Sequence, residues 1–154
     1  MRTSGIVFGA ALAVSLGLAA TAVAGRGRPE RASLDLANTG ADVSASGRVD
    51  LKHFPAAGKR DERSWMRFRL HRLDPDATYT LWMDDPSTDA DPALVDTGIT
   101  MTTNSRGGAN QRVDTKHGGT MPFGATLAAL AGMNFELRNG DGVAVLSGAL
   151  PAVQ

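Results

Sequence analysis

The chain has 154 residues, and its 16 basic residues (Lys and Arg) equal its 16 acidic ones, so the formal net charge is zero. A neutral balance gives no overall attraction to nucleic acid or to an anionic membrane, and we expect neither as a partner. The sequence contains no cysteine, which excludes a disulfide framework, thiolate catalysis, Cys-zinc sites and iron–sulfur clusters. Its length is enough for one domain with a buried core.

The N-terminus has the pattern of an export signal. Arg2 precedes an uncharged apolar run at residues 5–20, and Ala22 and Ala24 occupy the two small-residue positions of a cleavage site. The run is short for a bilayer span, which favours a cleaved signal over a membrane anchor. We therefore expect a signal peptide at residues 1–24 and a bacterial protein exported to the periplasm or the extracellular space, with no anchor after cleavage.

Residues 25–31 are polar and rich in glycine and arginine, and we expect them to be a flexible segment before the domain. From residue 32 onward, apolar residues mostly alternate with polar ones, which is typical of strands with one buried face. The apolar side of these strands is the predicted core, which consists of Val49, Leu51, Met66, Phe68, Leu70, Tyr79, Leu81, Ile99, Met101, Phe135, Leu137 and Val145.

Turn-forming sequences separate the predicted strands. Asp-Pro-Asp at 74–76 favours a tight turn, and both Asn-Ser-Arg-Gly-Gly at 104–108 and Asn-Gly-Asp-Gly at 139–142 favour hairpins. Only residues 125–131 have the composition of a short helix, with Gly132 to end it. Seven or eight short strands indicate an all-β sandwich or barrel, and we favour a single antiparallel β-sandwich over residues 32–154 with one short helix.

Three segments resemble those of small exported bacterial β-sandwich proteins, of the CHRD-like or immunoglobulin-like type. They are a strand at 46–51, a strand–turn–strand at 68–81 that ends in Tyr-Thr-Leu, and a hairpin and closing strand at 139–150. The resemblance implies the sandwich fold. CHRD domains usually carry a His-x-His pair where this chain reads Leu-Trp-Met-Asp-Asp at 81–85, so the resemblance implies no metal site here.

An acidic segment follows one of the predicted strands, and its carboxylates are Asp84, Asp85, Asp89, Asp91 and Asp96. Calcium takes six to eight oxygen ligands, and clustered aspartates in a loop supply them. Asp89 and Asp91 have the i, i+2 spacing of many calcium loops, although the glycine and the closing glutamate of an EF-hand are missing. These five residues are the candidate metal ligands, and calcium is the only candidate cofactor. The alternative is a solvated loop without a metal.

A second candidate site is basic, and it lies on the outward side of one predicted strand: Arg63, Trp65, Arg67, Arg69 and His71. Cations beside a tryptophan suit an anionic polysaccharide or a partner protein. Arg48 and Lys52 are expected on the outward side of the neighbouring strand. The alternative is a solvated outer face with no ligand.

Catalytic motifs are missing from the sequence. It contains neither a Gly-x-Ser-x-Gly elbow nor a phosphate-binding loop, and its three histidines, His53, His71 and His117, are far apart along the chain. We therefore predict an exported, non-enzymatic binding or structural module of unknown partner. The alternatives are a metal-binding module that uses residues 84–96, and an enzyme whose residues meet only in the fold.

Overall fold

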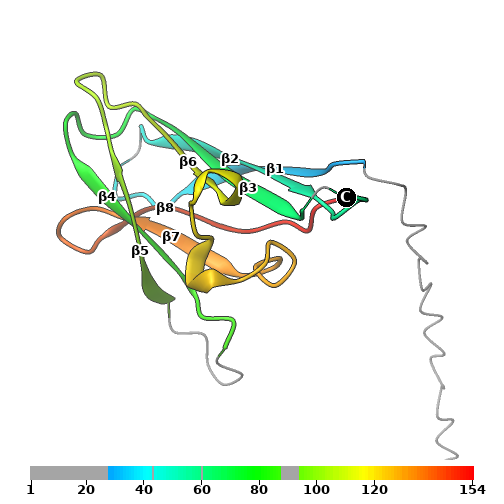
Figure 1. The fold of residues 1–154 in the computed structure, drawn as a ribbon. Coiled ribbons are helices and arrows are strands. Elements are labelled where there is room, and N and C mark those ends of the chain that lie inside the picture. Colours follow the sequence, from blue (N-terminus) through cyan, green and yellow to red (C-terminus); the bar gives the residue numbers. More distant parts are fainter. Residues whose placement is uncertain (1–27, 43, 60, 88–93) are drawn as a thin grey trace, which may run out of the picture.

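The computed structural model describes residues 28–42, 44–59, 61–87 and 94–154. These parts of the chain form eight strands, which confirms the predicted all-β class (Figure 1). The strands are β1 (Glu30–Asn38), β2 (Ser46–Phe54), β3 (Arg63–His71), β4 (Thr78–Asp84), β5 (Leu94–Thr102), β6 (Ala109–Asp114), β7 (Asn134–Arg138) and β8 (Ala144–Ala149). The expected signal peptide lies outside the described residues, and β1 begins inside the segment that we expected to be flexible.

All eight strands belong to one antiparallel sheet with the order β5-β4-β7-β8-β1-β2-β3-β6. Strand β1 joins its two halves, because residues 30–36 pair with β2 whereas Ala37 and Asn38 pair with β8. The edge strands β5 and β6 also contact each other, so the sheet is nearly closed. The hydrogen-bond ladder continues through β1, so the described strands form one nearly closed, barrel-like sheet and are not clearly divided into the two sheets of the predicted sandwich.

Apolar side chains from both halves fill the interior. Phe68 of β3 and Phe135 of β7 meet edge to face, with their ring centroids 6.1 Å apart. Every residue of the predicted core is buried except Ile99, which is half-buried. The reason is local, because β5 is an edge strand whose register against β4 shifts between Thr80 and Trp82, opposite this part of β5.

The helix predicted at residues 125–131 is wrong, and the segment forms consecutive turns instead. The backbone N–H groups of Ala129 and Leu130 both donate to the carbonyl of Thr126, which starts one turn. Gly132 N–H then donates to the Leu150 carbonyl at 2.6 Å, so hydrogen bonding passes to the C-terminal segment and the helix does not continue. The 3-10 helices η1 (Thr115–His117) and η2 (Pro122–Gly124) precede this segment.

The two predicted hairpins have different outcomes. The hairpin at 139–142 is confirmed, because Asn139 N–H donates to the Val143 carbonyl at 2.9 Å and β7 pairs with β8. At residues 104–108 the turn forms, with Gly107 N–H donating to the Asn104 carbonyl at 2.9 Å, but it does not make a hairpin. It connects β5 to β6, which lie at opposite edges of the sheet order, and β6 pairs with β3.

Candidate functional site

Strand β3 presents the predicted basic residues on its outward side. Arg63, Trp65, Arg67, Arg69 and His71 alternate with the buried residues of the same strand. The flanking strands are β2 and β6, so Lys52 lies opposite Trp65 on one side and Asp114 lies opposite it on the other. In Figure 1 these strands, together with β1, form one side of the molecule.

A cleft of about 330 Å³ lies at the start of β3. We call it the cation–aromatic cleft, and β2, β3, β6 and η1 contribute its lining: Lys52, Phe54, Arg63, Trp65, Arg112, Asp114, Lys116 and His117. Sequence reasoning identified Arg63 and Trp65 as contact residues and missed Phe54, Arg112 and Lys116. No local signal marks these three, because only the pairing of β3 with β2 and β6 brings them to Trp65.

Aromatic rings hold most of the cations of the cleft. Lys52 Nζ lies 4.5 Å from the centroid of the Phe54 ring, and the guanidinium carbon of Arg63 lies 4.1 Å from the same centroid. The guanidinium carbon of Arg112 lies 4.8 Å from the centroid of the Trp65 ring. A ring positions a cation through its quadrupole without neutralising the charge. The cleft therefore fixes these cations. Lys52 and Arg63 take part in no ion pair among the described residues and keep their positive charge, whereas Arg112 also pairs with Asp114.

Asp114 is the only acidic residue in the lining of the cleft, and its carboxylate is fully engaged. Its oxygens accept from Arg112 Nη2 at 2.6 Å and from the Lys116 N–H at 3.0 Å, and His117 Nδ1 lies 2.9 Å away. Burial raises the pKa of Asp114, but the contacts with His117, Lys116 and Arg112 outweigh burial and hold it below its usual value. The carboxylate caps η1 and so positions Lys116 and His117.

Positive charge is in excess around Lys52. Desolvation and the neighbouring cations Arg31, Arg63 and Arg112 lower the pKa of Lys52 from its usual value. An anion bound in the cleft would relieve the repulsion, so the electrostatics favour a negatively charged ligand.

Further along the same face, a second group of residues has balanced charge. We call it the ion-paired cluster: Ser33, Asp35, Arg48, Asp50 and Arg69. Arg69 and Arg48 both donate to the Asp50 carboxylate, Arg48 also bonds Asp35 at 3.2 Å, and Ser33 Oγ donates to Asp50 at 2.8 Å. Burial raises the pKa of Asp50, but the hydrogen bonds from Ser33, Arg69 and Arg48 outweigh burial, so the pKa lies below its usual value. Arg69, a predicted contact residue, is therefore committed to a carboxylate of its own chain.

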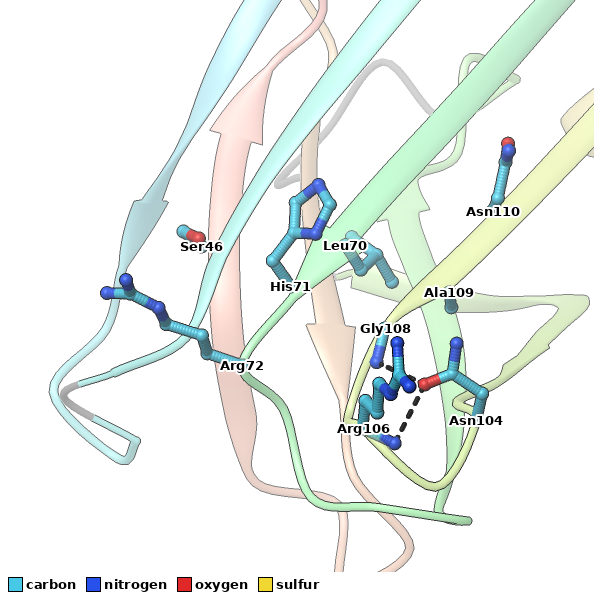
Figure 2. Close-up of a pocket in the computed structure, with 9 residues that line it drawn as sticks. All are labelled: Ser46, Leu70, His71, Arg72, Asn104, Arg106, Gly108, Ala109 and Asn110. Atoms are coloured by element: carbon cyan, nitrogen blue, oxygen red, sulfur yellow. Dashed lines mark hydrogen bonds between the residues drawn. The ribbon is translucent and has the colours of Figure 1, made fainter.

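A wider hollow of about 760 Å³ lies at the other end of β3, around His71. Figure 2 shows that Arg72 extends on the side of Ser46, whereas Arg106 lies beside Asn104. Asn104 shapes the loop that carries Arg106, because its Oδ1 accepts from the Arg106 N–H at 2.9 Å and from the Gly108 N–H at 3.1 Å. We call this the His71 hollow.

The predicted acidic site divides into separate local contacts. Asp84 is buried at the end of β4 and accepts from the backbone and side-chain amides of Asn134, at 2.8 and 3.0 Å. Asp85 accepts from the Ser87 hydroxyl and N–H, which lowers its pKa, and Asp96 accepts from the Gly98 N–H. Asp89 and Asp91 lie outside the described residues. Within the described ranges, no three His, Asp or Glu side chains gather as a metal site.

Comparison of the chain with protein-family models, with curated proteins and with solved structures gives no match. The search for membrane spans likewise finds, in the described part of the chain, no helix that is long and apolar enough to cross a bilayer.

Proposed function

We propose that this protein is an exported, non-enzymatic binding module that holds an anionic polysaccharide in the cation–aromatic cleft. The observation that carries the proposal is the placement of Lys52, Arg63 and Arg112 against aromatic rings, with one carboxylate, Asp114, in the whole lining. The Lys52 ammonium and the Arg63 guanidinium keep both their charge and their N–H donors for carboxylate or sulfate oxygens, whereas Arg112 shares its charge with Asp114.

We also propose that the domain is related to exported β-sandwich domains of the CHRD-like or immunoglobulin-like type. The antiparallel strands and the hairpin at 139–142 support it. Export itself rests on the signal-like N-terminus.

A polysaccharide fits the cleft better than a protein partner does. Protein interfaces are usually anchored by apolar or aromatic side chains that fill pockets. The large apolar residues that are exposed in the described part of the chain are Val95, Phe123 and Val143, and none of them lies on β2, β3 or β6. The cleft offers cations and half-buried rings, which are the groups that contact acidic sugars.

Binding without catalysis is supported by the state of Asp114. A general acid or base works best with a pKa near the operating pH. The pKa of Asp114 is held below its usual value, and its carboxylate already accepts from three donors. This carboxylate stays ionised and positions η1, which is a structural task.

The test is a calorimetric titration of the purified protein with three polysaccharides: polygalacturonate (carboxylated), dextran sulfate (sulfated) and neutral dextran. We expect binding to one or both anionic polymers, binding that weakens as salt is added, and no binding to neutral dextran. The two anionic arms show which acidic group is preferred. Equal binding of neutral dextran would contradict the proposal. Single-stranded DNA is titrated as a fourth ligand, and tighter binding of it than of either anionic polymer would also contradict the proposal.

The double variant Lys52→Gln with Lys116→Gln locates the site. It removes two cations of the cleft without touching Asp114. We expect affinity for the anionic polymer to fall about tenfold, which corresponds to about 1.4 kcal/mol of binding free energy. Wild-type affinity in this variant would show that the ligand binds elsewhere.

A further inference from the structure

We propose that the His71 hollow is a second anchor for the same ligand, so that the protein binds a linear polyanion lengthwise along β3. This inference rests on the proposed function and adds to it the shape of the ligand and its path. The cation–aromatic cleft and the His71 hollow lie at the two ends of β3. The outward residues Trp65 and His71 line one each, and the buried Leu70 also borders the hollow.

The two anchors are separated by a fixed distance. Trp65 of the cleft and His71 of the hollow are six residues apart on β3, which is about 20 Å at about 3.3 Å per residue. Between them, Arg67 donates from Nε to Asn110 Oδ1 of β6 at 2.7 Å. On the β6 side of this path, the outward positions carry no carboxylate between Arg112 and His71. On the β2 side, the one carboxylate is that of Asp50, opposite Arg67, and it is already paired with Arg48 and Arg69.

The charge of the hollow is also positive. None of its nine lining residues is acidic, and Arg72 and Arg106 stand on two sides of it (Figure 2). Neither arginine takes part in any ion pair among the described residues. Both guanidinium groups are therefore able to bind carboxylate or sulfate oxygens.

The backbone that carries these arginines is held in place. Leu73 N–H donates to the Gly107 carbonyl at 3.0 Å, which ties the loop after β5 to the chain just after β3. A Cβ atom at Gly107 would lie 1.9 Å from the Leu73 carbonyl oxygen, so only glycine permits this close contact. Since the loop is fixed before a ligand arrives, little ordering of the backbone opposes binding.

Two anchors about 20 Å apart predict how affinity depends on ligand length. A short acidic oligosaccharide occupies one anchor at a time. An oligosaccharide long enough to reach both makes its second contact within the complex, at a high effective concentration, and binds more tightly. Once both anchors are filled, further length adds little.

The experiment is a titration of galacturonate oligomers of increasing length into the wild-type protein and the double variant Arg72→Gln with Arg106→Gln. We expect wild-type affinity to rise by at least about tenfold once the oligomer exceeds about 20 Å. The variant should bind short oligomers with nearly wild-type affinity and should lose the rise. The short oligomers are the internal control, because a long-range effect of the removed charges would weaken them too. Arg138→Gln, on β7 in the other half of the sheet, should leave the rise intact.

The outcomes separate this inference from the proposed function. If long oligomers show the same affinity as short ones, and Lys52→Gln with Lys116→Gln still weakens binding about tenfold, the second anchor is wrong and the cleft stands. If the Arg72/Arg106 variant keeps the full rise, the path does not end in the His71 hollow. If neither galacturonate oligomers of any length nor dextran sulfate bind the wild-type protein, the proposed function fails together with the inference.

Discussion

Two regions on one face of the sheet hold their cations in opposite ways. In the ion-paired cluster, Arg48 and Arg69 donate to Asp50, whose side chain is 13% exposed, and the charges cancel. In the cation–aromatic cleft, Lys52 and Arg63 lie against the Phe54 ring, which leaves their charge in place. The same strands therefore carry a cluster that stabilises the fold and a site that is open to an anion.

The difference depends on which residue of β2 faces β3. On β2, Asp50 and Lys52 are adjacent outward residues, opposite Arg67 and Trp65 of β3. A carboxylate at the first position draws in the neighbouring arginines, whereas the lysine and the aromatic residues at the next positions do not neutralise one another. A basic strand is thus evidence for a ligand site only where no carboxylate faces its cations.

Removal of the Phe68 ring should destabilise the part of the core that lies under both regions. Phe68 is buried directly under β3 and contacts Phe135 across the interior. Phe68→Ala should lower the free energy of unfolding by about 3–5 kcal/mol, measured by urea denaturation. Ile99→Ala, at the half-buried edge position, is the control and should cost clearly less. A loss below about 1 kcal/mol for Phe68→Ala would contradict its central position.

Asp50→Asn tests the structural role of the ion-paired cluster. The change weakens hydrogen bonds from two arginines and should cost about 1–2 kcal/mol at neutral pH. The folded-state pKa of Asp50 lies below its usual 3.8, so its stabilisation is complete above that value and is lost as pH falls through the folded-state pKa. Unfolding curves from pH 7 to pH 2 should therefore show the wild-type advantage shrinking below about pH 4. A constant advantage down to pH 2 would be inconsistent with this assignment.

The cleft cations should contribute far less to stability. Lys52→Gln with Lys116→Gln breaks no ion pair among the described residues and relieves repulsion around Lys52. We expect the midpoint of urea unfolding to stay at the wild-type value. A clear fall in the midpoint would make these lysines structural and would remove the contrast with the ion-paired cluster.

Calcium should have the smallest effect. Asp84 and Asp96 already accept backbone hydrogen bonds in separate places, so we expect no shift of the melting temperature at millimolar calcium. An ion that binds only the folded state would raise it by mass action. A rise that disappears in the double variant Asp89→Asn with Asp91→Asn would instead identify a calcium site at residues 84–96.

Local alternation was sufficient to predict which side of β2, β3, β4 and β7 is buried. Met66, Phe68 and Leu70 face the interior, and Arg67 and Arg69 face outward, as a period of two requires. The pairing of strands was not predictable in this way. The turn at 139–142 pairs the two strands that it joins. The turn at 104–108 also forms as expected, but its strands pair with other strands, and its sequence alone does not distinguish the two outcomes.

The residues that line the cleft could not all be predicted from the sequence, for the same reason. Arg112 and Lys116 are about fifty residues from Trp65 in the sequence and reach it only because β6 pairs with β3. The helix at 125–131 failed because of a long-range contact as well, since Gly132 donates to Leu150 and ends the helical hydrogen bonds. Sequence periodicity predicts which side of a strand is buried. A site made of several strands depends on the order of those strands in the sheet, which periodicity does not give.

The central claim is that cations held by rings bind the ligand and cations held by carboxylates do not. Two double variants remove the same charge from the two regions: Lys52→Gln with Arg63→Gln, whose cations both lie against the Phe54 ring, and Arg48→Gln with Arg69→Gln. Their affinities for a galacturonate oligomer shorter than about 20 Å should be compared by calorimetry at one salt concentration. We expect the cleft variant to bind about tenfold more weakly than the wild type and the cluster variant to change by less than about threefold. Equal losses, or a larger loss in the cluster variant, would contradict the claim.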